Sequence, residues 1–271
     1  MKDDIIYGRN PVIEALEAGK TVIDKIWIQD GLRHSQIAHI RALAKDRGIL
    51  YRFVDRRKLD TLCEGENHQG VAAAIATHAY AELEDILKLA EDRGEPPFLV
   101  IAEGITDPHN LGSILRSANG AGVHGVIIPK NRSTALNGTV AKVSAGAVEY
   151  TKVARVTNIA QTLEKLKKRG IWVVGTDLSG TQLYTECDLT GPLAVVIGSE
   201  GDGISRLTRE ACDFLVKIPM LGEIQSLNAS VASGILLYEA VRQRSLEGTT
   251  CVFWQSEISW QRTAANIFII I

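Results

Sequence analysis

Short apolar segments alternate with segments of helical periodicity through most of this 271-residue chain. From residue 98 onward, apolar runs of four to six residues are separated by stretches in which apolar positions recur every three or four residues. This alternation is typical of a mainly parallel sheet that helices cover on both faces. The predicted strands are Phe98–Glu103, Gly125–Pro129, Thr151–Arg155, Trp172–Gly175, Leu193–Ile197 and Phe214–Ile218. The predicted helices are Leu111–Ala121, Thr139–Gly146, Ile159–Arg169, Arg206–Ala211 and Leu227–Gln243.

The first 77 residues carry a smaller pattern of the same kind. A proline near its start is suited to the first turn of a helix, and a glycine ends the second helical stretch. We therefore expect a small α/β domain over residues 1–77. Its predicted elements are a helix that contains Ile13–Leu16, a strand Asp24–Gln29, a helix Ser35–Arg47, and strands Ile49–Val54 and Gly70–Ala76.

An acidic stretch, residues 78–97, separates the two patterns and ends in two consecutive prolines. It contains a predicted helix over Leu83–Ala90. We expect this stretch to link the first domain to a second domain over residues 98–244. Residues 245–271 follow neither period, and we expect them to be a cloning-derived or out-of-frame extension that is not part of the fold.

The composition is that of an ordinary globular protein, with 45% hydrophobic and 23% charged residues and a formal net charge of −2. The first residues lack the basic-then-apolar pattern of a signal peptide, and no apolar run reaches the length of a membrane span. We therefore expect a cytoplasmic protein without a membrane partner. The four cysteines are scattered and form no CxxC motif, which predicts reduced thiols and no metal site.

Basic residues are concentrated in one part of the first domain. Over residues 41–58, seven basic residues oppose two acidic ones, which gives a local charge of +5. Such a patch is suited to contacts with phosphates, although on charge alone a solvated helix face is the simpler explanation. The basic residues are Arg41, Lys45, Arg47, Arg52, Arg56, Arg57 and Lys58.

The chain contains one misleading glycine motif. Residues 120–125 match GxGxxG, but they follow a predicted helix and precede a strand, which is the reverse of the dinucleotide fingerprint. These glycines are better explained as a helix end and a tight turn. A nicotinamide-dependent dehydrogenase is therefore not supported, and the absence of a GxxxxGK[ST] motif gives no support to a phosphate-binding loop.

Polar residues cluster where three apolar strands are predicted to end. The carboxyl ends of parallel strands meet at one sheet edge, where open α/β folds bind small ligands. The two asparagines in these clusters are also explained as ordinary helix caps. Taken together, the side chains are suited to orienting a substrate while a cofactor carries the difficult chemistry. The candidate residues are Asn110, Arg116, Glu200, Ser226 and Asn228.

Three segments containing these residues resemble the ordered motifs of the SpoU/TrmH family of knotted RNA 2′-O-methyltransferases. They are ITDPHNLGSILRSANGAGVHGVI, VVIGSEGDGIS and IPMLGEIQSLNASVASGILLYEAVRQR. Upstream, IYGRNPVIEAL and NHQGVAA are similar to the edges of the RNA-binding domain in that family. The resemblance covers about residues 5–244, and within the family it is greatest to bacterial enzymes that methylate a guanosine ribose in 23S ribosomal RNA.

The resemblance implies a fold, an activity and partners. It implies a small α/β RNA-binding domain followed by a trefoil-knotted, mainly parallel methyltransferase domain that binds S-adenosylmethionine and forms a homodimer. The substrate would be structured RNA, either 23S ribosomal RNA or, as alternatives, tRNA or an RNA bound without catalysis. The five candidate residues match catalytic positions. The implied cofactor contacts are Thr176, Gly198, Ile218, Met220 and Leu227, and the implied RNA contacts are Arg41, Lys45, Arg52, Arg56, Arg57 and Lys58.

Overall fold

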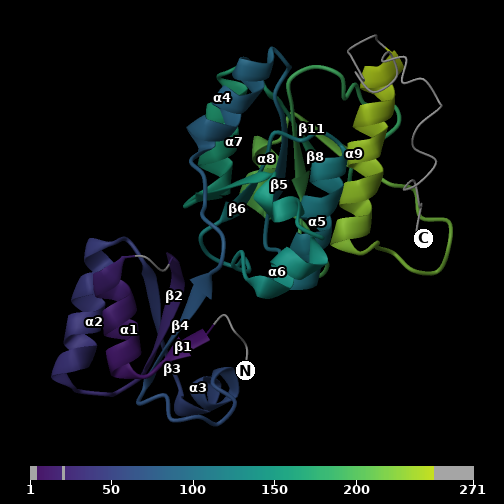
Figure 1. Cartoon of the computed structure of the whole chain (residues 1–271). Coiled ribbons are helices and arrows are strands. Elements are labelled where there is room, and N and C mark those ends of the chain that lie inside the picture. The colour runs from purple at the N-terminus through teal and green to yellow at the C-terminus, as the bar shows by residue number, and fades with distance from the viewer. Residues whose placement is uncertain (1–4, 20–21, 247–271) are drawn as a thin grey trace, which may run out of the picture.

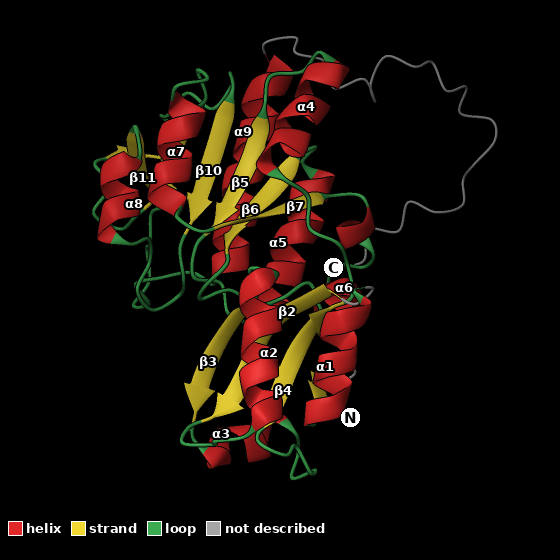
Figure 2. Ribbon diagram, turned by 90° about the vertical axis from the view of Figure 1, so that its left-hand side faces the viewer, coloured by secondary structure: helices red, strands yellow, loops and turns green. Residues whose placement is uncertain are grey.

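The computed structural model describes residues 5–19 and 22–246, which form two α/β domains (Figures 1 and 2). The predicted extension lies outside the described residues from residue 247 onward. No helix among the described residues is both long and apolar enough to cross a lipid bilayer. The first domain consists of β1 (Ile5–Tyr7), α1 (Arg9–Ala18), β2 (Val22–Gln29), α2 (Ser35–Asp46), β3 (Leu50–Val54), α3 (Arg56–Leu62) and β4 (Val71–Ala76).

The first sheet has the strand order β1-β4-β2-β3, and helices cover both of its faces. Strand β4 runs antiparallel to both neighbours, whereas β2 and β3 are parallel. Alternate residues of β2 point to opposite faces. Ile26 and Ile28 pack with Leu16 of α1 in one core, and Trp27 packs with Leu59 of α3 in the other.

The second domain is built around a seven-stranded sheet with the order β7-β6-β5-β10-β8-β11-β9. All strand pairs described in this sheet are parallel, which confirms the prediction of a mainly parallel α/β sheet. Its elements are α4 (Leu83–Arg93), β5 (Phe98–Ala102), α5 (Pro108–Gly120), β6 (Gly125–Pro129), α6 (Gly138–Val143), the short helix η1 (Ala147–Glu149), β7 (Lys152–Val156), α7 (Ile159–Lys167), β8 (Trp172–Thr176), β9 (Gln182–Leu183), β10 (Leu193–Ile197), α8 (Arg206–Ala211), β11 (Phe214–Lys217) and α9 (Ala229–Leu246).

Two apolar cores lie on opposite faces of this sheet. Helices α5 and α9 cover one face, and α4, α7 and α8 cover the other. Every residue of β5 and β10 is buried, which explains why both strands are continuous apolar runs in the sequence. Helix α4 lies within the stretch that the sequence suggests as a linker, yet its Ile86 is fully buried in this domain. A Cβ on Gly125 would lie 2.5 Å from Ile86, so the two elements pack closely.

The carboxyl ends of the central strands meet at one edge of the second sheet. Strand β10 inserts between β5 and β8, so strand ends from distant parts of the chain become neighbours. In Figure 2 the arrowheads of β5 and β10 point toward the first domain. The polar segments at these strand ends therefore lie on the side of the second domain that faces the first.

Candidate active site

A cavity of about 270 Å³ lies at this edge, where β8, β10 and β11 end and α9 begins. Its wall combines apolar strand residues with carboxylates from the following turns. Glu200 and Ser226 line it, as the convergence of strand ends predicts. The five residues that resemblance suggests as cofactor contacts also line this cavity: Thr176, Gly198, Ile218, Met220 and Leu227.

Three side chains from three separate segments form a closed network of hydrogen bonds at the same edge. Asn110 Nδ2 donates to Glu200 Oε1 at 3.2 Å, and Asn228 Nδ2 donates to Asn110 Oδ1 at 2.9 Å. Asn228 Nδ2 also donates to Glu200 Oε1. One carboxylate oxygen thus accepts two amide donors, which leaves its second oxygen available to a ligand. The structure therefore brings together one residue of each predicted motif.

Helix capping explains part of this network but not all of it. Asp107, not Asn110, caps α5, because its side chain accepts the His109 N–H at 2.9 Å. Asn110 is the third residue of the helix, and it is only 8% exposed. The capping explanation is therefore wrong for Asn110. Asn228 both caps α9 and takes part in the network. Its Oδ1 accepts the Ser230 N–H at 3.0 Å, and its amide nitrogen donates to Asn110.

Arg116 lines a different cavity from the one that contains Glu200. It lies six positions after Asn110 on α5, which places it about 120° around the helix and about 9 Å along it. Its own cavity, of about 550 Å³, is also lined by Ser144, Tyr150 and Tyr238. The guanidinium is exposed and forms no hydrogen bond or ion pair with another described residue. Within one chain, Arg116 therefore does not lie beside Glu200 and Ser226, although the sequence predicted that all three belong to one site.

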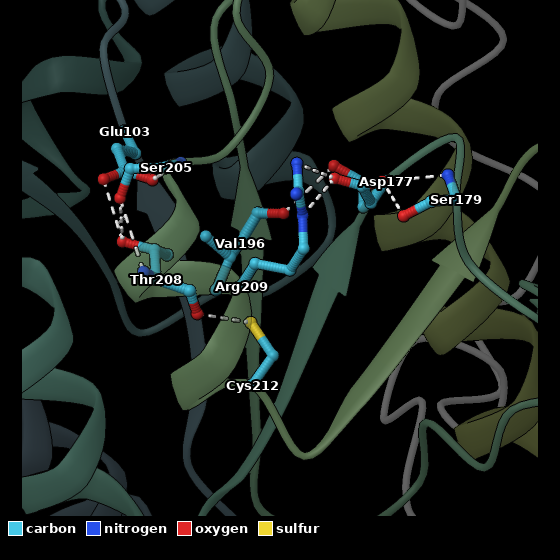
Figure 3. A network of polar contacts seen from close by, with 9 residues as sticks. Glu103, Asp177, Ser179, Val196, Ser205, Thr208, Arg209 and Cys212 are labelled. Atoms are coloured by element: carbon cyan, nitrogen blue, oxygen red, sulfur yellow. Dashed lines mark hydrogen bonds and ion pairs between the residues drawn. The ribbon is translucent and has the colours of Figure 1, made fainter.

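A set of side chains that was not among the predicted site residues anchors α8 beside the first cavity (Figure 3). Glu103, at the end of β5, accepts the Ser205 N–H at 3.0 Å and the Thr208 hydroxyl at 2.8 Å. Ser205 in turn caps α8. A carboxylate directly after a buried strand is the sequence signal that points to this role.

Asp177 and Arg209 form an ion pair in the cavity wall (Figure 3). The guanidinium contacts Asp177 Oδ2 with Nε at 2.8 Å and Nη2 at 2.7 Å, and Asp177 Oδ1 accepts the Ser179 N–H at 2.8 Å. Burial alone would raise the pKa of Asp177, but hydrogen bonds from Ser179 and the charge of Arg209 outweigh it and lower that pKa. Asp177 is therefore a carboxylate at neutral pH, and it fixes the turn that follows β8.

The predicted RNA-binding residues lie on elements that belong to both faces of the first sheet. The Arg41 guanidinium lies 5.8 Å from the ring centroid of Tyr51 and 5.5 Å from that of Phe53, on the face covered by α2. Arg52 lies between these residues in β3 and so points to the opposite face, where Nη2 donates to Asn131 of the second domain at 3.4 Å. The remaining predicted contacts are Lys45 on α2 and Arg56, Arg57 and Lys58 on α3.

Two sequence profiles match this chain. The profile of the SpoU rRNA Methylase family matches residues 97–238, and the profile described as RNA 2′-O ribose methyltransferase substrate binding matches residues 5–81. A Bacillus subtilis protein described as a putative TrmH family tRNA/rRNA methyltransferase is 50% identical over 90% of this chain and 98% of its own length.

Solved structures are similar over both domains. The SpoU methyltransferase AviRb from Streptomyces viridochromogenes, in complex with the cofactor AdoMet, has a TM-score of 0.57 and 27% identity, covering 89% of this chain and 90% of its own. An rRNA methyltransferase from Sinorhizobium meliloti has a TM-score of 0.54 and 27% identity, covering 88% of this chain and 86% of its own.

Proposed function

This chain belongs to the SpoU rRNA Methylase family and is an S-adenosylmethionine-dependent RNA methyltransferase, and we propose that it methylates the ribose 2′-hydroxyl of a guanosine in 23S ribosomal RNA. The observation that carries the proposal is the convergence of Asn110, Glu200 and Asn228 beside a cavity lined by all five expected cofactor contacts. The cytoplasm, where this RNA is found, is the proposed location.

The cavity residues fit S-adenosylmethionine in their combination of polar and apolar groups. The cofactor carries positive charge on its sulfonium and its ammonium group, and Glu200 and Asp202 supply carboxylates in the wall. The third carboxylate, Asp177, is paired with Arg209, and Lys217 adds a further positive charge to the lining. The apolar residues Ile197 and Val216 offer a surface for an adenine ring. When bound, the cofactor supplies a methyl group that its positive sulfur already makes electrophilic.

In this proposal the protein positions the ribose oxygen and helps it to lose its proton. The network of Asn110, Glu200 and Asn228 holds the start of α5 and the start of α9 in a fixed geometry, and such fixed alignment of two reactants lowers the barrier to their reaction. Arg116 binds a substrate phosphate and stabilises the negative charge that develops on the 2′-oxygen. A guanidinium has five N–H donors and no acceptor, so Arg116 is suited to binding an anion and not to taking up the proton.

We propose ribosomal RNA, rather than tRNA, as the substrate. The name of the B. subtilis relative includes both RNA classes, so it does not decide between them. The S. meliloti neighbour, which aligns over both domains, is described as an rRNA methyltransferase. A separate substrate-binding domain with basic residues on two faces is suited to a large structured RNA, which proteins recognise by shape and backbone contacts.

We further propose that two copies of the chain form a homodimer through the second domain. Val231 and Tyr238 are seven positions apart on α9, and they are 51% and 54% exposed. Tyr150, which lines the Arg116 cavity with Tyr238, is 80% exposed. A second copy on this face would cover these side chains and bring the unpaired Arg116 of one protomer to the site of the other. We also propose that the second domain contains a trefoil knot. The insertion of β10 between β5 and β8 supports the knot.

The proposed function is tested with RNA that lacks the modification. Purified protein, radiolabelled S-adenosylmethionine and RNA from a strain without this gene are combined, and the labelled nucleotide is identified by mass spectrometry. We expect one 2′-O-methylguanosine in 23S RNA and no label in tRNA. Label in tRNA alone would transfer the assignment to the tRNA alternative, and label on a base instead of a ribose would refute 2′-O-methylation.

The Asp177–Arg209 ion pair is expected to support cofactor binding indirectly. Arg209→Met leaves the turn after β8 without its anchor, and because Arg209 is 40% exposed we expect the dissociation constant for S-adenosylmethionine to rise only about fivefold. Calorimetric titration measures this change. Arg206→Met is the matched control, because Arg206 lies on the same helix in an exposed ion pair with Glu210. Equal affinities of both variants would contradict this role.

A further inference from the structure

The two domains meet at a buried ion pair. Arg155, in β7 of the second domain, contacts Asp24, in β2 of the first, with Nη1 2.6 Å from Oδ1. The side chains are only 14% and 9% exposed, respectively. By contrast, in the surface ion pair between Lys88 and Asp92 both side chains are more than half exposed.

Tyr80, from the connection between the domains, completes the cluster. Its hydroxyl donates to Asp24 Oδ1 at 3.5 Å and accepts the Leu136 N–H at 3.1 Å. Its ring lies 4.7 Å from the Arg155 guanidinium carbon, in a cation–π contact. Arg155 Nη2 also donates to the Lys130 carbonyl at 3.3 Å. The cluster therefore joins the first domain, the connection and the second domain.

The connection itself is fixed along the second domain. The Thr77 N–H donates to the Leu136 carbonyl at 2.8 Å, and the Ala81 N–H donates to the Val153 carbonyl at 2.8 Å. Between them, His78 Nε2 lies 2.9 Å from Glu149 Oε1. A connection held at both ends and in the middle restricts rotation of the first domain about it.

The charges in this cluster depend on each other. Burial raises the pKa of Asp24, and the positive charge of Arg155 opposes that effect. Burial likewise raises the pKa of Tyr80 to about 12, so its hydroxyl keeps the proton that it donates. Removal of one partner would leave the other as an uncompensated buried charge, and that penalty is relieved if the domains separate and admit water.

We propose that Asp24, Tyr80 and Arg155 are positioning residues for methyl transfer, because they hold the first domain in one orientation relative to the carboxyl edge of the second sheet. This inference rests on the proposed function, in which the first domain binds the RNA. Figure 2 shows the first domain on the side to which the arrowheads of β5 and β10 point. RNA bound there would reach the methyl donor at a fixed distance and angle. The three residues act through this geometry and need not touch RNA or cofactor.

Arg155→Met tests the inference by removing the charge while keeping much of the side-chain volume. We expect kcat/KM for 23S RNA to fall roughly 10- to 100-fold, because small misplacements of a reactant have effects of that size. The dissociation constant for S-adenosylmethionine should not change. Small-angle X-ray scattering should show a larger radius of gyration. Arg155→Lys should recover part of the activity, since it keeps the charge but loses the fork that binds Asp24 and the Lys130 carbonyl.

Arg169→Met is the matched control. Arg169 forms a two-point ion pair with Glu84, but both residues lie within the second domain. Tyr80→Phe removes only the hydroxyl, so it still tests the cluster if Arg155→Met fails to fold. Wild-type scattering and wild-type kcat/KM in both Arg155→Met and Tyr80→Phe would overturn the inference. If the wild-type protein shows no transferase activity, the proposed function is refuted. The scattering of the wild type and of the two variants would still decide whether the cluster fixes the orientation of the domains.

Discussion

Arg116→Ala is expected to lower the rate of methyl transfer about 100- to 1,000-fold, which is the usual loss when one donor to a developing oxyanion is removed. The affinity for S-adenosylmethionine should be unchanged, because Arg116 does not line the cavity that contains Glu200. Single-turnover transfer to 23S RNA measures the rate, and Lys88→Ala, an exposed cation on α4, is the control. Arg116→Lys should recover little, since an ammonium group lacks the planar fork that binds phosphate at two points.

A mixture of two inactive proteins distinguishes action within one chain from action across a dimer. Arg116→Ala is combined with Glu200→Ala, and the subunits are allowed to exchange. If Arg116 serves the partner protomer, each mixed dimer contains one intact site, and about a quarter of the wild-type activity should return. If Arg116 serves its own chain, no site is intact and no activity returns. That second result would contradict the proposed arrangement of the dimer.

Gly198→Ala is expected to weaken binding of S-adenosylmethionine roughly 5- to 150-fold. A Cβ at this position would lie 2.2 Å from the Gly203 carbonyl carbon and 2.4 Å from the Ile204 nitrogen. Both are backbone atoms, so the loop 198–203 that forms the cavity wall would have to move. Overpacking of this kind costs about 1–3 kcal/mol and is greatest where no side chain can rotate away. Calorimetry measures the binding, and thermal unfolding should show a lower midpoint.

Gly201→Ala provides the control for this prediction within the same loop. An added Cβ at Gly201 would have no heavy atom within 4 Å. We expect its affinity for S-adenosylmethionine to be within about twofold of wild type, since substitutions in open surface positions change stability little. If Gly198→Ala and Gly201→Ala behave alike, close packing of the loop does not shape the cavity.

Periodicity was sufficient to predict the sheet but not its strand order. The strands Leu193–Ile197 and Gly125–Pro129 have the predicted bounds, because each is a fully or almost fully buried apolar run that ends in glycine or proline or follows one. The placement of β10 beside β5 depends on contacts between residues 95 positions apart in the sequence, such as Leu193 and Phe98. No local pattern encodes such a pairing, and the sequence analysis did not predict it.

Site residues that lie near the ends of strands could be predicted from the sequence. The position of Arg116, which depends on the geometry of a helix, could not. Glu200 follows a predicted strand directly, and Asn228 lies where the connection after the next predicted strand leads into a helix, so their convergence is a consequence of the parallel sheet. Arg116 lies within a helix, where its direction depends on where that helix begins. Because Asp107 caps α5, the helix starts earlier than the apolar pattern indicates. The contact between Asp177 and Arg209 depends on the tertiary position of α8, and the sequence alone gives no measure of it.

Hydrogen exchange with and without S-adenosylmethionine tests most directly whether the ends of β8, β10 and β11 form the cofactor site. Binding should slow amide exchange in peptides that cover residues 176–178, 197–203 and 216–229, because these segments contain most of the residues that line the cavity. Peptides from the first domain should exchange at the same rate in both states. Protection confined to other segments, or no protection at saturating cofactor, would contradict the site.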